Sequence, residues 1–468
     1  MNLHAVASFS DAPETAAIIC LLSTASGSDT FATVSSGAWD ETWTKAGQKT
    51  LISHDGRTII CLGMGEAPTL EHYRKAAHTV FSTAAGWRMN EIAVVTEALS
   101  DDQAQAFVEG AILSAYRFTR HLSKPAPEVL TDLYLVGFSE AAIQTGSVTA
   151  AAACEARDLV NEPANILTAT KLATEAKRLG EKYGFTTEIL EMSKIQSLKM
   201  GGLLAVNAGS VEPPTFTIME YKPETPINDQ PVVLVGKGVV YDTGGLSLKP
   251  TANSMDFMKC DMAGGAAVIG AMCGVAGLGL DVHVIGLVPA TDNRPGLNAW
   301  APGDIVTMYD GTTVENFNSD AEGRMLLADA LSYAKQYNPS LVIDLATLTG
   351  AQVVAIGQPG MALMATAEDE TVANMDAAGH HTYERVVRLP LWEEYGDMLK
   401  SEIADIKNLG PRQAGSITAG KFLQHFTDYP WIHLDIAGPA WSPQPDSYRG
   451  QGGTGVGVRM LIQFLKAM

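Results

Sequence analysis

Apolar and polar positions along the chain alternate in a way that predicts two α/β units in succession. In the first unit, short apolar runs of strand length are separated by longer stretches in which apolar residues recur at helical spacing. Strands are expected at 16–22, 58–65, 91–96 and 132–138, and helices at 73–86 and 105–122. Because strands alternate with helices, this part predicts a mainly parallel or mixed sheet covered by helices.

The second unit repeats the alternation on a larger scale. Its runs at 231–242, 282–291 and 340–349 are apolar at nearly every position, which is typical of strands buried on both faces. A glycine-containing helix is expected over 263–279, and an amphipathic helix over 326–337. These patterns predict a larger α/β domain with a central mixed, mainly parallel sheet.

The joint between the units is expected in a small-residue stretch at 146–165. Its pattern is helical until Pro163, and proline disfavours helical geometry at the residue before it. We therefore expect an N-terminal α/β domain at 1–148, a linker helix at 149–163 and a catalytic domain at 164–468.

Composition and charge narrow the classes of function. The chain has 32 basic and 52 acidic residues, a net charge of −20 that would repel phosphates, so no nucleic-acid partner is expected. We expect no apolar run to reach the ~18 residues of a membrane span, and therefore expect no membrane partner either. The five cysteines include no CxxC pair, and the N-terminus lacks the basic start of a signal peptide. A cytoplasmic enzyme with reduced thiols is the best interpretation.

Charged residues gather beside glycines in three segments of the larger domain, 236–250, 255–265 and 318–325. These residues are Lys237, Asp242, Lys249, Asp261, Asp320, Glu322 and Arg324. One by one, they can be explained as turn aspartates, helix caps or acidic residues at a helix start. Together they indicate a site, because ligands of open α/β sheets bind at the carboxyl ends of strands.

Four of these residues are carboxylates, and two divalent cations would neutralise their four charges. Without cations, converging carboxylates would repel and raise one another's pKa values. Oxygen ligands favour Mg²⁺ or Mn²⁺, although Zn²⁺ also accepts carboxylates. A two-metal site can polarise a carbonyl or a phosphoryl group, so the residues predict a metallohydrolase and leave amide and phosphoester substrates both open.

Three segments carry a resemblance to a known family. VGKGVVYDTGGLSLKP (235–250), FMKCDMAGGAA (257–267) and NSDAEGRMLLADAL (318–331) are similar to the defining motifs of the leucyl aminopeptidase (cytosol aminopeptidase) family. The likeness extends over 155–168, 343–351, 389–395 and 433–441. It covers the chain after residue 150, whereas the first 150 residues resemble the family only in position and α/β character. The resemblance implies an enzyme that releases N-terminal, preferably leucine-like, residues from peptides.

The resemblance also implies a role for each charged residue. One metal site would be built by Lys237, Asp242, Asp261 and Glu322, and a more exchangeable one by Asp242, Asp320 and Glu322. The metal would be Mn²⁺ or Zn²⁺, and a metal-bridging hydroxide would attack the scissile carbonyl. A lysine ligates only as the neutral amine, so burial and the adjacent cation must depress its pKa.

The catalytic groups implied by the family are Lys249 and Arg324. Lys249 would stabilise the oxyanion that develops at the carbonyl, and Arg324 would hold a bicarbonate ion that serves as general base. Both argue against a non-catalytic scaffold or regulator, which would need neither residue. A different binuclear hydrolase, such as a phosphoesterase, is the other alternative to the peptidase.

Specificity and assembly are implied in the same way. The pocket for the first side chain of the peptide would be lined by Met258, Thr347 and Gly350, with main-chain contacts from Leu348 and small residues at 437–440. The ordinary alternative for Met258 is a core methionine. The family assembles as a homohexamer whose active sites face an interior cavity, and we expect the same here.

Overall fold

The computed structural model describes residues 1–54, 57–125 and 130–468. Contacts within the chain divide it into two units, residues 1–151 with 445–450 and residues 152–444 with 451–468. The division falls within a single long helix, α4 (Glu140–Asn161), which ends two residues before Pro163. Each unit is described by itself.

The first unit is built on a six-stranded sheet in the order β1-β6-β5-β2-β4-β3. Its strands are β1 (Asn2–Val6), β2 (Ala17–Ser23), β3 (Lys49–His54), β4 (Arg57–Gly65), β5 (Glu91–Val95) and β6 (Asp132–Val136). All pairs are parallel except β3 with β4. Its helices are α1 (Gly27–Ala32), α2 (Leu70–Trp87), α3 (Asp101–Ala115) and the first half of α4. The four predicted strands of this unit are present within two residues of their expected bounds.

The helix predicted over 105–122 is wrong at both ends, because α3 spans Asp101–Ala115. Its start is set by Ser100, whose hydroxyl accepts a hydrogen bond from the backbone N–H of Gln103 at 3.3 Å in a capping box. Its end is set where Arg117 donates to the carbonyl of Ser114 at 2.8 Å. A basic side chain that satisfies a last-turn carbonyl in this way favours helix termination.

The second unit is built on a nine-stranded sheet in the order β16-β15-β18-β14-β9-β11-β8-β7, with β10 beside β11. Its principal strands are β7 (Thr186–Leu190), β8 (Thr215–Tyr221), β9 (Val232–Gly236), β10 (Gly238–Asp242), β11 (Val284–Asn293), β14 (Leu341–Ala346), β15 (Met361–Ala365), β16 (Val386–Arg388) and β18 (Trp431–Asp435). The pairs of β9 with β11 and β14 are parallel, and β8 and β15 pair antiparallel to their inner neighbours. The predicted class, a mixed and mainly parallel sheet, is confirmed.

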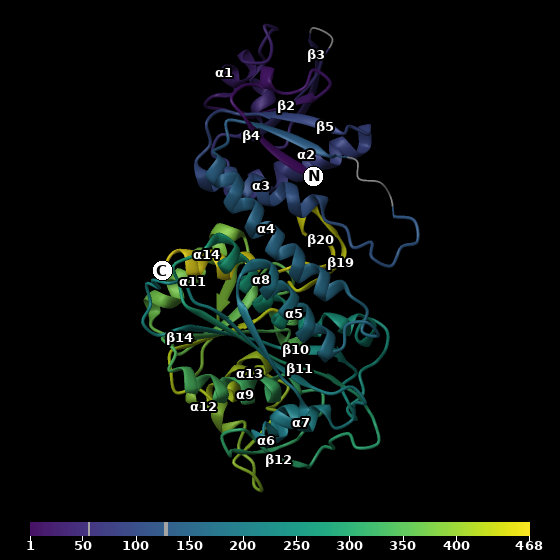
Figure 1. Ribbon diagram of the computed structural model, residues 1–468, viewed down its shortest axis with the longest axis vertical. Helices are drawn as coiled ribbons and strands as arrows, with labels where there is room; N and C mark the ends of the chain where they lie inside the picture. Colours follow the sequence, from purple (N-terminus) through teal and green to yellow (C-terminus); the bar gives the residue numbers. More distant parts are fainter. Residues whose placement is uncertain (55–56, 126–129) are drawn as a thin grey trace. The chain divides into compact units, whose positions relative to one another are not determined.

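Helices cover both faces of this sheet. One face carries α5 (Ala169–Tyr183), α8 (Ala263–Leu278), α11 (Asp369–Thr382) and α14 (Val458–Lys466), and the other α6 (Met192–Ser197), α7 (Gly201–Asn207), α9 (Gly323–Ala334), α12 (Glu393–Asp397) and α13 (Gly415–Gln424) (Figure 1). The short elements are α10 (Gly350–Ala355), β12 (Ile305–Thr307), β13 (Thr313–Glu315), β17 (Ile406–Lys407), β19 (Trp441–Asp446) and β20 (Gly450–Gly453).

Between the sheet and α9, a fully buried core joins Val233, Leu287 and Val342 to Leu326 and Phe422. Burial on both faces explains why these strands are apolar at nearly every position.

One segment corrects the expectation about membrane spans. Met255–Leu278 is long and apolar enough, by length and composition, to cross a membrane, although Asp256, Lys259 and Asp261 interrupt its apolar run. In the structure 83% of its apolar window is buried, and it folds as a 3₁₀ helix (Met255–Met262) followed by α8. This is the central helix of the unit, packed against the sheet.

The apolar run at 231–242 was predicted as one strand, and the structure divides it at Lys237. β9 ends at Gly236 and β10 begins at Gly238, where the chain keeps its pairing with β11 and loses its pairing with β14. The start of α8 comes so close that a Cβ on Gly236 would lie 2.6 Å from the carbonyl oxygen of Gly264. The break places Lys237 at the edge where β14 ends, and Asp242 at the end of β10.

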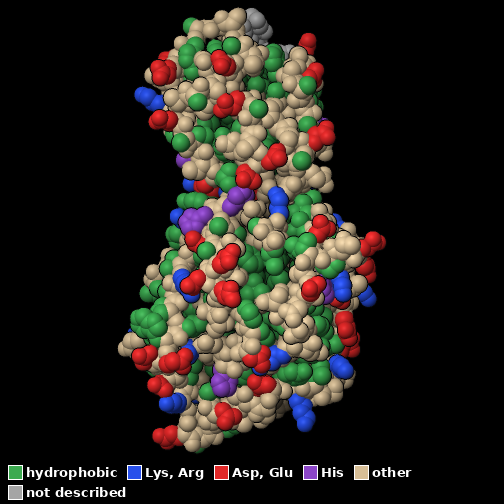
Figure 2. Space-filling model, turned by 90° about the vertical axis from the view of Figure 1, so that its left-hand side faces the viewer, with side chains coloured by type: hydrophobic (Ala, Val, Ile, Leu, Met, Phe, Trp, Pro, Cys, Tyr) green, Lys and Arg blue, Asp and Glu red, His purple; other side chains and the backbone are tan. Residues whose placement is uncertain are grey.

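The excess of acidic over basic residues is visible on the surface of the protein. On the face drawn in Figure 2, acidic side chains are spread over the surface, and lysine and arginine side chains do not gather into one patch.

Candidate metal centre

Three buried carboxylates meet at the carboxyl edge of the larger sheet. Asp242 ends β10, Asp261 lies in the 3₁₀ helix before α8, and Glu322 is the residue immediately before α9. One oxygen of each lies within 4.8 Å of the others, and the residues are 2%, 4% and 1% exposed. Buried like charges at this spacing repel strongly, so the cluster requires positive charge.

Two lysines lie among these carboxylates. The Nζ atom of Lys237 is 2.7 Å from Asp261 Oδ1 and 2.9 Å from Glu322 Oε1. The Nζ atom of Lys249 is 2.8 Å from Asp242 Oδ2 and also contacts a carboxylate oxygen of Asp320. The structure therefore brings together all four carboxylates and both lysines that the sequence singled out.

Local packing fixes the position of Lys237. A Cβ on Gly323 would lie 2.5 Å from Lys237 Cε, so the glycine leaves the space that the lysine stem occupies. The ammonium also donates to the carbonyl oxygen of Thr347 at 2.9 Å, and the Thr347 hydroxyl donates to Asp261 Oδ1 at 2.9 Å. The turn after β14 thus holds both a lysine and a carboxylate of the cluster.

Burial and mutual repulsion shift the titration of the cluster. Burial, then the charges of Asp242 and Glu322, raise the pKa of Asp320 to about 7. Burial also raises the pKa of Asp261. For Lys237, burial alone would lower the pKa, but the surrounding carboxylates outweigh it and raise the value. Ligation by the neutral amine would therefore require a cation that displaces this proton.

Arg324 is the second residue of α9, two residues after Glu322. Its guanidinium is buried and donates from Nη1 to the carbonyl oxygen of Asn408 at 2.7 Å. Burial lowers the pKa of Arg324 to about 10, although Glu322 and Asp435 oppose the shift. Its Nε atom has no hydrogen-bond partner among the described residues. A buried guanidinium with a free donor is suited to hold an anion.

A cavity of about 280 Å³ opens above the carboxylates. All four residues expected to contact the substrate, Met258, Thr347, Leu348 and Gly350, line it, together with Ala437 and Gly438 of the small-residue stretch. Arg324 is not among its described lining residues.

The sequence analysis missed several lining residues. They include Phe257, Thr349, Val353, Gln358, Trp441 and Pro443. Trp441 directly follows the AGPA stretch that was expected to border the pocket, which was the available signal. Phe257 lies next to Met258 in the chain, Val353 lies in α10, and Gln358 lies just after α10. Nothing in the pattern of these residues marks them.

Comparison with known proteins decides the family. Residues 154–462 match the Cytosol aminopeptidase family, catalytic domain, and residues 41–125 match the N-terminal domain of the same family. The chain belongs to the cytosol aminopeptidase family. The match at 41–125 goes beyond the general likeness that the sequence analysis found for the first 150 residues.

Relatives of this aminopeptidase are similar along most of their length. A "Probable cytosol aminopeptidase" of Chlorobium limicola is 45% identical over 433 residues, which cover 86% of this chain and 85% of the relative. One of Chlorobaculum tepidum is 44% identical, with 87% and 86% covered. The expected membership of the family is confirmed, and the chain is an aminopeptidase, a hydrolase of peptides.

Solved structures of relatives share the fold of this aminopeptidase. The bottromycin maturation enzyme BotP in complex with Mn is 34% identical, with a TM-score of 0.86 and coverage of 97% of this chain and 99% of that one. A mutant of tomato leucine aminopeptidase is 29% identical, with a TM-score of 0.87 and coverage of 100% and 97%.

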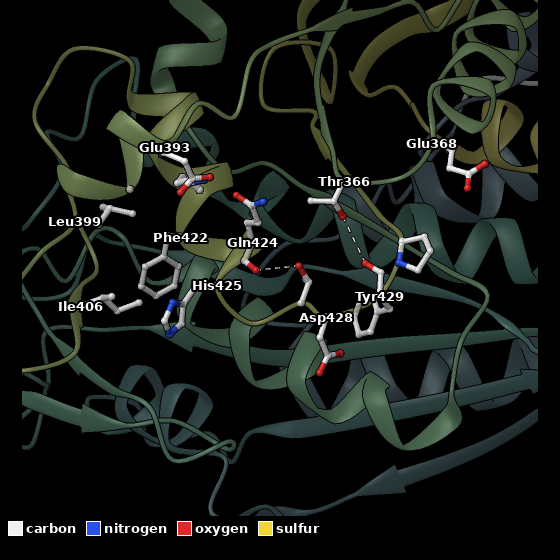
Figure 3. Close-up of a pocket in the computed structure, with 14 residues that line it drawn as sticks. Thr366, Glu368, Glu393, Leu399, Ile406, Phe422, Gln424, His425, Asp428 and Tyr429 are labelled. Carbon is white, nitrogen blue, oxygen red and sulfur yellow. Dashed lines mark hydrogen bonds and ion pairs between the residues drawn. The ribbon is translucent and has the colours of Figure 1, made fainter.

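A second, larger hollow of about 720 Å³ lies elsewhere in the catalytic unit of this aminopeptidase (Figure 3). It is lined from α12, α13 and the segments after β15 and α13. Two of its three carboxylates are paired with lysines. Lys421 Nζ is 2.7 Å from Glu393 Oε1, and Asp428 Oδ2 is 3.1 Å from the Nζ atom of Lys335. Among the described residues, the group of carboxylates close enough to hold a metal ion is Asp242, Asp261 and Glu322, so this hollow is a weaker candidate for the chemistry.

Proposed function

We propose that the chain is a two-metal aminopeptidase that releases leucine-like residues from the N-terminus of peptides. The observation that carries this proposal is the cluster of Asp242, Asp261 and Glu322, with Asp320 beside it, at the floor of the cavity. Two divalent cations would neutralise these four carboxylates.

The residues fit divalent cations in charge and in chemistry. Asp261 Oδ2 is buried and has no hydrogen-bond partner among the described residues, so an oxygen ligand is left over inside the cluster. Asp242, Asp261, Glu322 and Lys237 would hold one ion, and Asp242, Asp320 and Glu322 the other, more exchangeable one. Carboxylate oxygens accept Mn²⁺ and Zn²⁺, and the relative BotP is described in complex with Mn. When bound, such ions polarise the scissile carbonyl and supply a hydroxide nucleophile at neutral pH.

The protein's own groups would complete the chemistry. Lys249 is only 15% exposed and lies over the carboxylates, so its charge would stabilise the oxyanion that forms at the carbonyl carbon. Arg324 would hold a bicarbonate ion through its free Nε donor, and a bicarbonate held there would supply a general base. Thr347 and Leu348 would orient the peptide from the turn after β14.

The cavity wall supports a preference for apolar first residues. Met258, Phe257, Val353 and Trp441 line it, and its charged groups are those of the metal cluster itself. A long apolar side chain would replace water against this wall, whereas an acidic or basic side chain would be desolvated without a partner.

Assembly and location follow the family in this proposal. We infer a homohexamer with the active sites facing an interior cavity, acting in the cytoplasm on small peptides. Sedimentation velocity of the purified chain would test the hexamer. A monomer at micromolar concentration would remove it from the proposal.

The activity is tested by removing and restoring the metal. We would treat the protein with a chelator and measure hydrolysis of leucine p-nitroanilide before and after addition of Mn²⁺ or Zn²⁺. We expect activity to vanish and to return with the ion. A folded protein that binds the ions but hydrolyses no aminoacyl anilide would overturn the proposal.

Specificity is tested in the same assay with matched substrates. We expect leucine and methionine p-nitroanilides to exceed the glutamate and arginine derivatives in kcat/KM. A Met258→Glu variant provides the control, because a carboxylate in the wall should lower hydrolysis of the leucine substrate more than that of the arginine substrate. Equal rates for apolar and charged substrates would contradict the leucine-like preference.

A further inference from the structure

Asn293 is a fully buried residue beside the metal cluster with no role in the mechanism above. It is the last residue of β11 and lies opposite Asp242 of β10, at the point where the register between the two strands shifts. The shift brings its side chain to the ends of two different loops that carry expected metal ligands.

Each hydrogen bond of its amide group reaches one of these loops. The Nδ2 atom donates to Asp242 Oδ1 at 2.8 Å and to the carbonyl oxygen of Ser319 at 2.9 Å. Both partners only accept hydrogen bonds, so the amide must present its NH₂ group to them. Ser319 directly precedes Asp320, so one side chain connects the loop of Asp242 to the loop of Asp320.

The hydrogen bond from Asn293 determines which carboxylate oxygen of Asp242 is available to ligate a cation. Oδ1 accepts from Asn293 Nδ2 and from the backbone N–H of Gly244, both at 2.8 Å. Oδ2 is the atom that faces Lys249 and the remainder of the cluster. Because Oδ1 accepts two hydrogen bonds, the carboxylate cannot rotate freely, and Oδ2 is held toward the expected cation positions.

We propose that Asn293 is a positioning residue that sets the spacing between the two metal positions, by holding Asp242 and the Asp320 loop in one register. This inference rests on the proposed two-metal function. It concerns how tightly and at what distance the ions are held, and Asn293 itself touches no substrate.

Other hydrogen bonds connect the same segments, which are the Asp242 loop, the Asp320 loop and the end of β11. The Ser319 hydroxyl donates to the carbonyl oxygen of Gly244 at 2.7 Å and accepts from the backbone N–H of Ser247 at 2.8 Å. The Thr243 hydroxyl donates to the carbonyl oxygen of Asn293 at 2.8 Å. Asn293 is distinguished from these residues because it alone of the three bonds a carboxylate oxygen of an expected ligand through its side chain.

The test measures metal binding directly. We would titrate Mn²⁺ into the metal-free protein by isothermal calorimetry, comparing wild type with Asn293→Ala and Asn293→Asp. Loss of a group that holds a metal ligand typically weakens binding by about 10- to 100-fold, and we expect Asn293→Ala to fall in that range. Asn293→Asp keeps the shape but loses the donor, so it should weaken binding as the alanine variant does.

Asn207 offers a matched control. It is also buried, and its Nδ2 atom also donates twice, to the carbonyl oxygen of Glu212 at 2.8 Å and to the Thr291 hydroxyl at 2.9 Å. Asn207→Ala should lower thermal stability and leave Mn²⁺ affinity unchanged.

The outcomes separate the two proposals. Wild-type protein that binds no Mn²⁺ or Zn²⁺ would contradict the two-metal function itself. Wild-type protein that binds Mn²⁺, with Asn293→Ala binding it equally well, would overturn only the role of Asn293. Equal loss of affinity in Asn293→Ala and Asn207→Ala would also overturn it, because the effect would then be general to buried amides.

Discussion

Both units of the chain bury charged side chains in a helix-covered sheet, but they neutralise them in different ways. In the N-terminal unit, Arg74 of α2 and Glu109 of α3 form an ion pair between two packed helices, with Nε and Oε2 3.0 Å apart. Gln105 donates to the other carboxylate oxygen at 2.9 Å. In the catalytic unit, four carboxylates share two lysines around a cavity.

The difference distinguishes a structural charge from a functional one. A buried pair with complementary hydrogen bonds contributes to the fit between α2 and α3. A cluster with an excess of negative charge opposes folding by its own repulsion, and it gains stability when cations bind. The following substitutions test this contrast, from the largest expected effect to the smallest.

Glu322→Gln should have the largest effect, because Glu322 is expected to ligate both ions. We expect kcat/KM to fall by at least about 10,000-fold even at saturating Mn²⁺, because both ions would lose a ligand. Each factor of ten corresponds to about 1.4 kcal/mol of lost transition-state stabilisation. Steady-state hydrolysis of leucine p-nitroanilide measures it. Activity within tenfold of wild type would remove Glu322 from the ligand set.

Glu109→Ala should affect stability and leave the chemistry unchanged. It removes the nearest carboxylate from the buried guanidinium of Arg74, and breaking a buried pair in this way costs about 3–5 kcal/mol in the free energy of unfolding. Urea unfolding measures that loss, and kcat/KM of the folded variant should equal that of wild type.

A surface pair is the control for this substitution. Arg388 Nη1 and Asp369 Oδ1 are 2.7 Å apart, but both side chains are largely exposed. Asp369→Asn should therefore change the free energy of unfolding by less than about 1 kcal/mol. Equal losses in Glu109→Ala and Asp369→Asn would show that burial does not govern the Arg74–Glu109 pair.

Lys249→Met should slow the chemical step without abolishing metal binding. Removing one group that stabilises an oxyanion lowers kcat by about 100- to 1,000-fold. We expect that loss with little change in KM, and Mn²⁺ binding by calorimetry should persist. A variant with normal kcat would limit Lys249 to neutralising Asp242 and Asp320.

Asp329→Asn should have the smallest effect, on the pH dependence of stability. Asp329 lies in α9 outside the cluster, and its carboxylate accepts from the backbone N–H groups of Leu203 and Tyr309, both at 2.9 Å. Burial raises its pKa to about 7. Between roughly pH 4 and 7 the native state therefore keeps a proton that the unfolded chain has released, and stability falls as the pH rises through this range.

The variant has no such proton to lose. We expect the decrease in unfolding free energy between pH 5 and 7 to be smaller in Asp329→Asn than in wild type by about 1–2 kcal/mol. Urea titrations at the two pH values measure it. Parallel pH dependences would show that the carboxylate is ionised in the native state across this range.

The sequence by itself determined the fold class and the list of chemical residues. Apolar runs at nearly every position predicted strands buried on both faces, and charged residues beside glycines stood out against them. The separate motifs containing Asp242, Asp261 and Glu322 are local, so their residues could be read directly from the chain.

The tertiary structure decided how these residues meet. The break at Lys237 depends on the close approach of Gly264 to Gly236, a contact between residues far apart in the sequence. Asn293 came to the site through strand register and carries no local signal of its own, whereas the AGPA stretch before Trp441 only hinted at the position that loop packing gives this residue. Periodicity reports which face of an element is buried, whereas register and close approach depend on long-range contacts that no short pattern contains.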